Sequence, residues 1–440
     1  MYFLIESMRD GMKPFIFPKG FLFGSATAGA QVEGGDKNSN WYDWAQKGHI
    51  KDGSDILRTG DHWNRYREDI SLLNQMHHQV YRMGIEWSRI EPQEGHFDEQ
   101  AIQHYRDMLI RLNENHIRPL VTLFHFTYPI WLDKIGGFES KKVIPLFKRY
   151  VRFVVERLGD LVSEFITINE PNVLMLNGYV IGIWPPGKKS LKAGYKVFVN
   201  LSLCHIAAYH IIHEIRCKRQ FKGETMVGVA LHLRLFDPLR RGHTLDSYLA
   251  EKEQFFFQDV FADYMTGGTL PKPAKYFVPH GYEGHYADFI GINYYSRNMV
   301  NILDPKTIVQ PNRPVNDLGW EIYPDGLRIL CEEFSKRFRL PIWITENGVC
   351  DNHDTMRARF IAEHLRAVKR AIDNGALVER YYHWSLLDNF EWLEGESARF
   401  GLVHIDYETE QRTIKKSGYF YADVCENGGC TEEMIKKYHL

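Results

Sequence analysis

The segment from Asp98 to Phe126 reads DEQAIQHYRDMLIRLNENHIRPLVTLFHF and contains the unit from which the fold is built. Its first part predicts an amphipathic helix, because apolar residues recur at a spacing of three or four and Asp98 can cap the first turn. Its second part, Arg118 to Phe126, is strongly apolar and has no alternating polar face. Such a run is typical of a buried strand in a parallel sheet.

The same pairing of an apolar run with a longer helical pattern recurs along the chain. We expect eight strands, at residues 21–27, 79–87, 118–126, 164–170, 225–233, 288–295, 341–347 and 379–388. Helices are expected at residues 98–115, 143–158, 193–216, 245–265, 325–338 and 357–374. Eight strand–helix units predict an α/β fold, a (β/α)8 TIM barrel with extended βα loops, as a single domain over residues 1–440.

A doubly wound open sheet is the rival architecture. A dinucleotide-binding sheet of that kind carries a Gly-rich phosphate loop after its first strand. The corresponding segment here, GSATAGAQVEGG at residues 24–35, lacks the GxGxxG spacing, and the sequence contains no GxxxxGK[ST]. The pattern therefore favours the barrel over the open sheet.

The composition excludes several classes of protein. The 440 residues include 54 Lys and Arg against 56 Asp and Glu, a formal net charge of −2, and 44% of the chain is hydrophobic. These values are typical of a globular protein and provide no basic excess for the phosphates of a nucleic acid. Aromatic residues make up 14%, which fits either a large core or a cleft lined with rings.

The cysteines and the first residues bear on the cellular compartment. The first apolar run, residues 2–5, is shorter than the core of an export signal, and no run approaches the length of a membrane span. Six cysteines without a CxxC pair are too sparse for a disulfide framework. We expect a cytoplasmic protein with no membrane partner. A Cys425–Cys430 disulfide and a homo-oligomer both stay open.

Polar residues stand at or near the ends of several predicted strands, where a barrel places its active site. They are Gln31, His125, Asn169, Glu170, Asn293, Tyr295, Glu346, Asn347 and Asp388, while Arg82 and Trp384 lie inside the second and eighth predicted strands. Two carboxylates, Glu170 and Glu346, suit the cleavage of a glycosidic bond, in which one carboxyl is protonated and the other ionised. The alternative is that both glutamates are structural and pair with arginines such as Arg82.

Local sequences around these glutamates favour the catalytic interpretation. TINEP at residues 167–171 and ITENG at residues 344–348 resemble the two active-site sequences of glycoside hydrolase family 1, the β-glucosidase family. Other segments resemble this family in the same order along nearly the whole chain: FPKGFLFGSATAGAQVEGG, YRMGIEWSRIEP, LFHFTYPIWL, GINYY, GWEIYPDGL, HWSLLDNFEW and RFGLVHIDYET.

The resemblance implies a retaining exo-β-glycosidase of the β-glucosidase type, acting on a small-molecule β-glycoside such as an oligosaccharide or an aryl or alkyl glucoside. It implies Glu170 as the general acid/base and Glu346 as the nucleophile. It implies that catalysis is supported by Arg82, Asn169, Tyr295 and Asn293. It implies that the sugar is bound by Gln31, His125, Trp384, Glu391 and Trp392, and Trp320 and Phe400 are further candidates for the wall of the sugar cleft. The resemblance implies neither a cofactor nor a metal.

Two positions bear on the substrate. Family members that act on 6-phosphorylated sugars usually lack a glutamate at the position of Glu391, since a carboxylate repels phosphate, so this residue favours a neutral sugar. Phe126 stands where the family usually has Trp or Tyr, which leaves β-galactosidase and β-fucosidase as alternatives. A non-catalytic carbohydrate-binding barrel is disfavoured, because both glutamates are present.

Overall fold

The computed structural model describes residues 11–269, 284–304 and 308–440. The short apolar run at residues 2–5, which bears on export, lies outside these described residues. Among the described residues, no helix combines the length and the apolar character needed to cross a bilayer.

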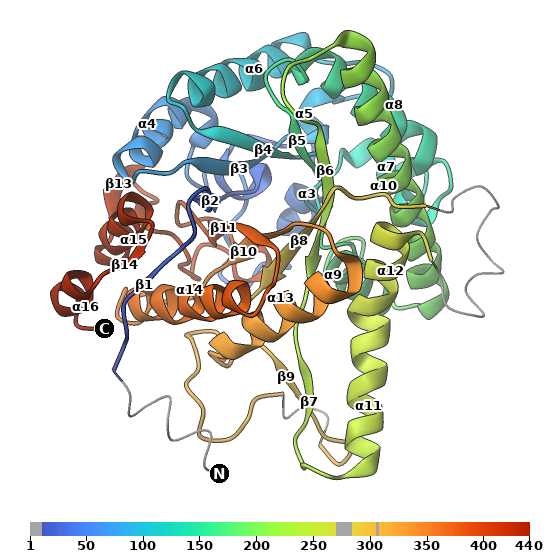
Figure 1. The fold of residues 1–440 in the computed structure, drawn as a ribbon. Helices are drawn as coiled ribbons and strands as arrows, with labels where there is room; N and C mark the ends of the chain where they lie inside the picture. The colour runs from blue at the N-terminus through green and yellow to red at the C-terminus, as the bar shows by residue number, and fades with distance from the viewer. Residues whose placement is uncertain (1–10, 270–283, 305–307) are drawn as a thin grey trace.

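Eight parallel strands close into a barrel in the order β10-β11-β2-β3-β4-β5-β6-β8 (Figure 1). The strands are β2 (Leu22–Ala26), β3 (Val80–Gly84), β4 (Arg118–Thr122), β5 (Glu164–Asn169), β6 (Met226–His232), β8 (Phe289–Tyr294), β10 (Ile342–Asn347) and β11 (Val378–Trp384). All eight predicted strands are confirmed, each shorter than expected by one to four residues. The closed order excludes the open sheet.

Helices surround the barrel on its outer side (Figure 1). The main ones are α4 (His62–Gln75), α6 (Glu99–Glu114), α8 (Val143–Leu158), α10 (Leu191–Arg219), α12 (Val260–Gly267), α13 (Pro324–Phe338), α14 (Arg357–Asp373) and α15 (Lys416–Asn427). The six predicted helices are confirmed, and α4 and α15 complete the ring. The expected helix at residues 245–265 consists of α11 (Thr244–Gln254), a π-helical turn at Phe255–Asp259 and α12.

Helix α6 forms for the reasons that its sequence indicated. The Asp98 carboxylate accepts hydrogen bonds from the backbone N–H groups of Gln100 and Ala101, at 2.8 and 3.0 Å. It thereby satisfies two of the donors that a helix start leaves unpaired. The apolar stripe that includes Ile102 and Leu109 is buried.

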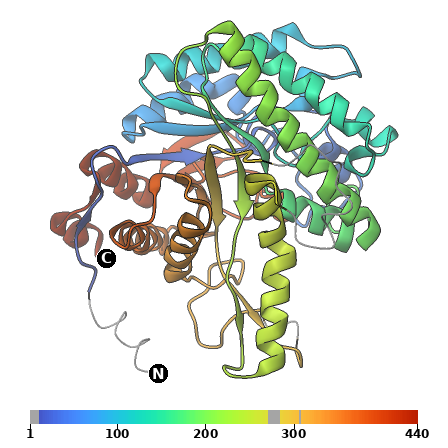
Figure 2. The same ribbon diagram turned by 45° about the vertical axis from the view of Figure 1, so that its right-hand side comes forward.

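The loops carry further elements. Short helices are α2 (Gly29–Val32), α3 (Asn40–Gln46), α5 (Trp87–Ile90), α7 (Ile130–Lys134), α9 (Pro171–Leu174) and α16 (Glu432–Tyr438). Short strand pairs are β1 (Phe15–Ile16) with β14 (Gly429–Cys430), β7 (Phe236–Pro238) with β9 (Asn298–Val300), and β12 (Val403–Asp406) with β13 (Gln411–Ile414). Helix α11 with β7 and β9 projects from the barrel as an arm (Figures 1 and 2).

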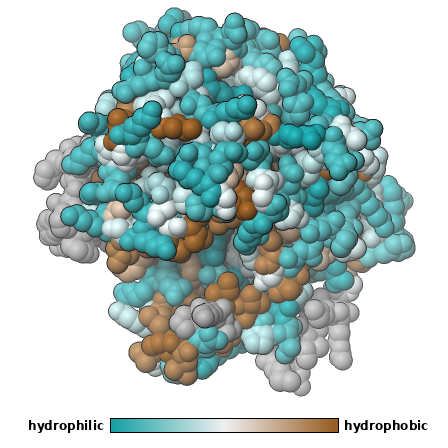
Figure 3. Space-filling view, turned by 180° about the vertical axis from the view of Figure 1, so that it is seen from behind, coloured by the Kyte–Doolittle hydropathy of each residue, from teal (hydrophilic) through white to brown (hydrophobic). Residues whose placement is uncertain are grey.

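Alternate residues of each strand divide the core into two parts. Val80 joins an inner cluster with Leu120, Ile166 and Trp343, whereas its neighbour Tyr81 belongs to the larger cluster that includes the buried faces of the helices. Seen from behind, the upper part of the surface is mostly hydrophilic, and hydrophobic residues gather lower down (Figure 3). All six cysteines are free thiols, including the buried Cys425 and Cys430.

Close contact between neighbouring strands makes Gly24 a sensitive position. A Cβ atom there would lie 1.8 Å from the Val80 carbonyl oxygen, whereas a Cβ atom at buried Gly60 would have its nearest neighbour at 3.6 Å. We expect Gly24→Ala to lower the free energy of unfolding by about 3 kcal/mol, because β2 and β3 must separate. Denaturant unfolding measures this, with Gly60→Ala as the matched control. Equal stability of the two variants would contradict the close packing.

Candidate active site

The two predicted glutamates lie at the carboxyl ends of their strands. Glu170 directly follows β5, and Glu346 is the fifth residue of β10. In both strands the pairing register shifts just before the glutamate, between Ile166 and Asn169 on β5 and after Ile344 on β10. Such irregularities re-aim side chains and are common beside active sites.

The backbone of Glu170 has a left-handed conformation, with φ 41° and ψ 58°. This conformation is costly for a residue with a side chain and usually marks a constrained position. Pro171 occupies the first turn of α9, where the missing N–H is not needed. The chain therefore turns sharply from β5 into α9 at Glu170.

Arg82 lies fully buried in the middle of β3 and contacts three other strands. Its Nη1 donates to Glu346 Oε1 at 2.7 Å and its Nη2 donates to Asn169 Oδ1 at 2.6 Å. Its Nε donates to Thr122 Oγ1 at 2.9 Å. The guanidinium thus joins the nucleophile candidate to the residue beside the acid/base candidate.

The second oxygen of Glu346 is held from the other side. The Tyr295 hydroxyl donates to Glu346 Oε2 at 2.6 Å. Asn293 pairs in register with Glu346 on the neighbouring strand, and its Oδ1 accepts from Thr345 Oγ1 at 2.7 Å. Arg82 and Tyr295, two of the residues expected to support catalysis, therefore contact the two oxygens of Glu346, whereas the Asn293 side chain bonds to the adjacent Thr345.

Glu170 has a different set of partners. Its Oε1 lies 2.9 Å from Asn293 Nδ2 and 3.0 Å from His232 Nδ1. Two residues near Glu170 were not predicted from the sequence: His232, the last residue of β6, and the nearby Arg234. The sequence pattern at His232 is nonetheless the one that identified the other candidates, because it is a polar residue at the end of an apolar strand.

The environments shift the pKa values of these carboxyls. Burial raises the pKa of Glu346 to about 7; the charge of Glu170 adds to the rise, and Arg82 and Tyr295 oppose it. Burial acts to raise the pKa of Glu170, and a positive charge on His232 together with the hydrogen bonds from His232 and Asn293 would act to lower it. The two carboxyls interact, so they titrate as a pair.

The predicted sugar-binding polar residues line the same end of the barrel. Gln31 Nε2 donates to Asn389 Oδ1 at 3.0 Å and reaches Glu391 Oε2 at 3.4 Å. His125 Nε2 accepts from Asn169 Nδ2 at 2.9 Å. Burial, followed by the charge of Glu346, raises the pKa of Glu391 to about 8. Gln31 Oε1 and His125 Nδ1 are buried and make no hydrogen bond to any described residue.

The predicted aromatic residues form two groups. Trp384 and Trp392 each lie with their rings nearly parallel to His125, at 5.9 Å between ring centres. Trp320 and Phe400 instead contact the ring of Tyr295, at 5.9 and 6.2 Å. Phe126, which replaces the usual Trp or Tyr, contacts Trp392 and a tryptophan that the sequence analysis missed, Trp184.

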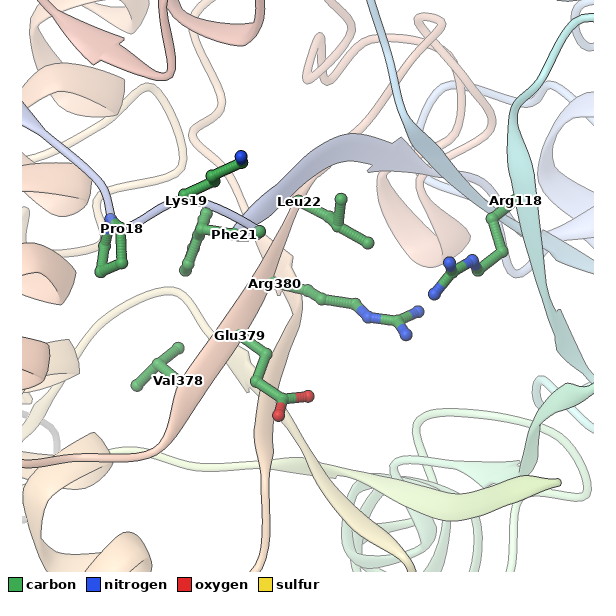
Figure 4. Close-up of a pocket in the computed structure, with 9 residues that line it drawn as sticks. Pro18, Lys19, Phe21, Leu22, Arg118, Val378, Glu379 and Arg380 are labelled. Atoms are coloured by element: carbon green, nitrogen blue, oxygen red, sulfur yellow. The ribbon is translucent and has the colours of Figure 1, made fainter. Parts of the chain in front are cut away.

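A separate pocket of about 410 Å³ opens at the other end of the barrel, where β2, β4 and β11 begin (Figure 4). Its arginines and its glutamate are already engaged. Arg118 and Arg380 pair with Glu164, Arg380 stacks on Trp343, and Glu379 accepts a hydrogen bond from the Trp343 indole. This end of a barrel usually serves stability.

Within the described residues, no three His, Cys, Asp or Glu side chains are placed to hold a metal ion.

Two buried carboxyls at the carboxyl end of a closed (β/α)8 barrel suit glycosidic bond cleavage, so the fold and the site point to the class of barrel glycosidases. Residues 14–430 match the family model for glycosyl hydrolase family 1. The chain belongs to this family and is a glycoside hydrolase.

Relatives of known name agree with this family. The chain is 32% identical to the 1,4-beta-D-glucan glucohydrolase of Thermotoga neapolitana, over 94% of this chain and 99% of that protein. The solved structure of a family 1 β-glucosidase from Thermotoga maritima superposes with a TM-score of 0.88 at 30% identity, covering 95% of this chain and 99% of that one. The Beta-galactosidase of Saccharolobus solfataricus is 28% identical, over 96% and 97%.

The burial of Arg82 leads to a prediction about stability. We expect Arg82→Met to lower the free energy of unfolding by about 3–5 kcal/mol, because it leaves a buried carboxylate without its cation. The loss should be larger at pH 8 than at pH 5. Without Arg82 the pKa of Glu346 rises further, so at pH 5 the carboxyl is protonated and no unpaired charge is buried, whereas at pH 8 keeping it folded is costly. Urea unfolding at both pH values measures it.

The double variant Arg82→Met, Glu346→Gln is the matched control, since residue 346 is then neutral and needs no cation beside it. It should recover much of the lost stability and show little dependence on pH. A pH-independent loss in Arg82→Met alone would contradict the role of the ion pair.

Proposed function

We propose that this glycoside hydrolase is a retaining β-glucosidase that removes terminal β-linked glucose by double displacement. The observation that carries the proposal is the pair of contacts on Glu346, with Arg82 on one oxygen and the Tyr295 hydroxyl on the other. A cation and a hydrogen-bond donor stabilise a carboxylate and orient it for attack. Glu346 is then the nucleophile and Glu170 the general acid/base.

One proton belongs to this pair of carboxyls, because the charge of each opposes ionisation of the other. Of the effects that oppose the rise in the Glu170 pKa on burial, the largest is a positive charge on His232. We infer that His232 is neutral, because burial lowers its pKa and Arg234 donates to its Nε2 atom. Arg82 is then the cation in contact with the pair, and it contacts Glu346. We therefore assign the charge to Glu346 and the proton to Glu170.

The proposed reaction has two steps. Glu346 attacks the anomeric carbon while Glu170 gives its proton to the departing glycosidic oxygen, which leaves a covalent glycosyl-enzyme. Glu170, now ionised, takes a proton from a water that attacks the same carbon and frees Glu346. Two inversions give net retention, and this route requires the carboxyl groups to lie about 5–5.5 Å apart.

The remaining polar groups suit a sugar in the subsite before the scissile bond. Gln31 and His125 each present a buried atom without a hydrogen-bond partner among the described residues, as expected of groups that bind sugar hydroxyls. Asn169 would bind the sugar 2-OH. The apolar face of a β-pyranose can lie against an indole ring, the role proposed for Trp384, with Trp392 beside it.

Glu391 supports a neutral sugar over a phosphorylated one. Burial raises the pKa of this carboxyl most, and the negative charge of the nearby Glu346 raises it further. A phosphate dianion at this position would meet the same field. A β-galactosidase is the second candidate, since Phe126 offers no N–H donor to select the sugar and one relative is named a β-galactosidase.

Six free thiols support a cytoplasmic location.

Replacing the two glutamates tests the proposed roles. We expect Glu346→Gln to abolish hydrolysis of nitrophenyl β-glucoside, because the amide cannot form the intermediate. Glu170→Gln should lower kcat/KM for substrates with poor leaving groups by about 10²–10⁴-fold. Exposed Glu408→Gln serves as the control and should keep full activity. Steady-state kinetics measure all three, and turnover by Glu346→Gln would exclude it as the nucleophile.

A panel of nitrophenyl β-glycosides tests the substrate. We expect the highest kcat/KM for the glucoside, with the 6-phosphoglucoside at least about 10-fold lower because of charge repulsion near Glu391. Glu391→Gln should narrow that difference at pH 9, where the Glu391 carboxyl is ionised, and change it little at pH 6, where that carboxyl is protonated. A preference for the galactoside would favour the second candidate, and a preference for the phosphorylated sugar would contradict the interpretation of Glu391.

A further inference from the structure

His232 lies at the end of β6, buried between a carboxyl and a guanidinium. Its Nδ1 is 3.0 Å from Glu170 Oε1, and its Nε2 is 2.7 Å from Arg234 Nη2. Arg234 is anchored in turn, because its Nη1 donates to Asn298 Oδ1 at 3.1 Å and its backbone N–H donates to Gln258 Oε1 at 2.9 Å.

The chemistry of arginine determines the state of this imidazole. A guanidinium stays protonated in proteins and only donates, so His232 Nε2 must be the acceptor in its contact with Arg234. The ring is then neutral and carries its proton on Nδ1, which donates to Glu170 Oε1. Burial lowers the pKa of His232 and supports the neutral ring.

The second donor to Glu170 approaches the same oxygen. Asn293 Nδ2 lies 2.9 Å from Glu170 Oε1, and its amide orientation follows from Thr345 Oγ1, which donates to Asn293 Oδ1. Two donors on Oε1 engage both lone pairs of that oxygen. A proton on the Glu170 carboxyl is therefore directed to Oε2.

We propose that Arg234 and His232 are positioning residues that select the oxygen from which Glu170 delivers its proton. Arg234 sets the tautomer of His232, His232 and Asn293 hold Oε1, and Oε2 carries the proton to the departing glycosidic oxygen. The inference rests on the proposed role of Glu170 as the acid/base. It assigns functions to two residues that lie outside the predicted site.

Leaving-group dependence separates positioning from a purely structural role. A 2,4-dinitrophenyl group departs without protonation, whereas an alkyl group needs the acid. We expect His232→Phe, which keeps a ring but loses the donor, to lower kcat/KM for an alkyl β-glucoside by about 10–100-fold, the usual effect of losing a hydrogen bond to an ionisable group. The dinitrophenyl glucoside should change less than about 3-fold.

Substitutions at Arg234 test the tautomer. Arg234→Met should reproduce the selective loss on the alkyl glucoside, and Arg234→Lys, which keeps a cationic donor, should restore most of it. Arg106→Met is the control for loss of an arginine, because Arg106 is a half-buried residue of the outer helix α6 that pairs with Asp160. Equal losses on both substrates in His232→Phe and Arg234→Met would overturn the proposal.

Nitrogen-15 NMR of the histidine rings provides a readout that needs no turnover. The wild-type protein should show His232 protonated on Nδ1 and not on Nε2, and Arg234→Met should shift the tautomer populations. An Nε2–H tautomer or a doubly protonated ring in the wild type would overturn the proposal. If wild-type protein hydrolyses neither glucoside, the proposed function fails, while the NMR result still decides the state of His232.

Discussion

The buried guanidinium of Arg82 is the interaction on which the site depends. A cation with no exposed surface is stable in a barrel only if each donor finds an acceptor, because its removal from water is costly. Glu346 supplies the countercharge, and Asn169 and Thr122 accept further hydrogen bonds. These partners come from β10, β5 and β4, so a single charge on β3 ties the mouth of the barrel together.

Shared hydrogen bonds extend that order to the rest of the site. Asn293 Nδ2 lies within hydrogen-bonding distance of both Asn169 and Glu170, while its oxygen accepts from Thr345. Each side chain in this network limits the orientation of the next, which is how preorganised sites are held. The left-handed backbone at Glu170 is compatible with this arrangement, because β5 and α9 support it on both sides.

The sequence predicted the strands well because apolar runs in a buried parallel sheet leave few alternatives. It indicated Glu170 and Glu346 as candidates for catalysis because their neighbours resemble a known family. It missed His232 and Arg234, since a histidine ending an apolar strand has the same pattern whether it packs in a core or contacts a carboxyl of the candidate site. Which ring nitrogen carries the proton depends on a partner two residues away, at Arg234, and on the fold that aims both side chains. Trp184 was missed for a similar reason, because its role arises only where it meets Phe126 and Trp392.

The contact between Arg82 and Glu346 also explains why this site requires a closed barrel. In the strand order, β3 and β10 are separated by β2 and β11, three strand spacings that would amount to about 14 Å across a flat sheet. One guanidinium could not span that distance to Glu346 and also reach Asn169 on β5, two strands away in the other direction. Curvature brings the inward-facing ends together, so the ion pair and the closure of the sheet depend on each other. A sequence that kept both glutamates but lost closure would retain the residues of the site without their geometry.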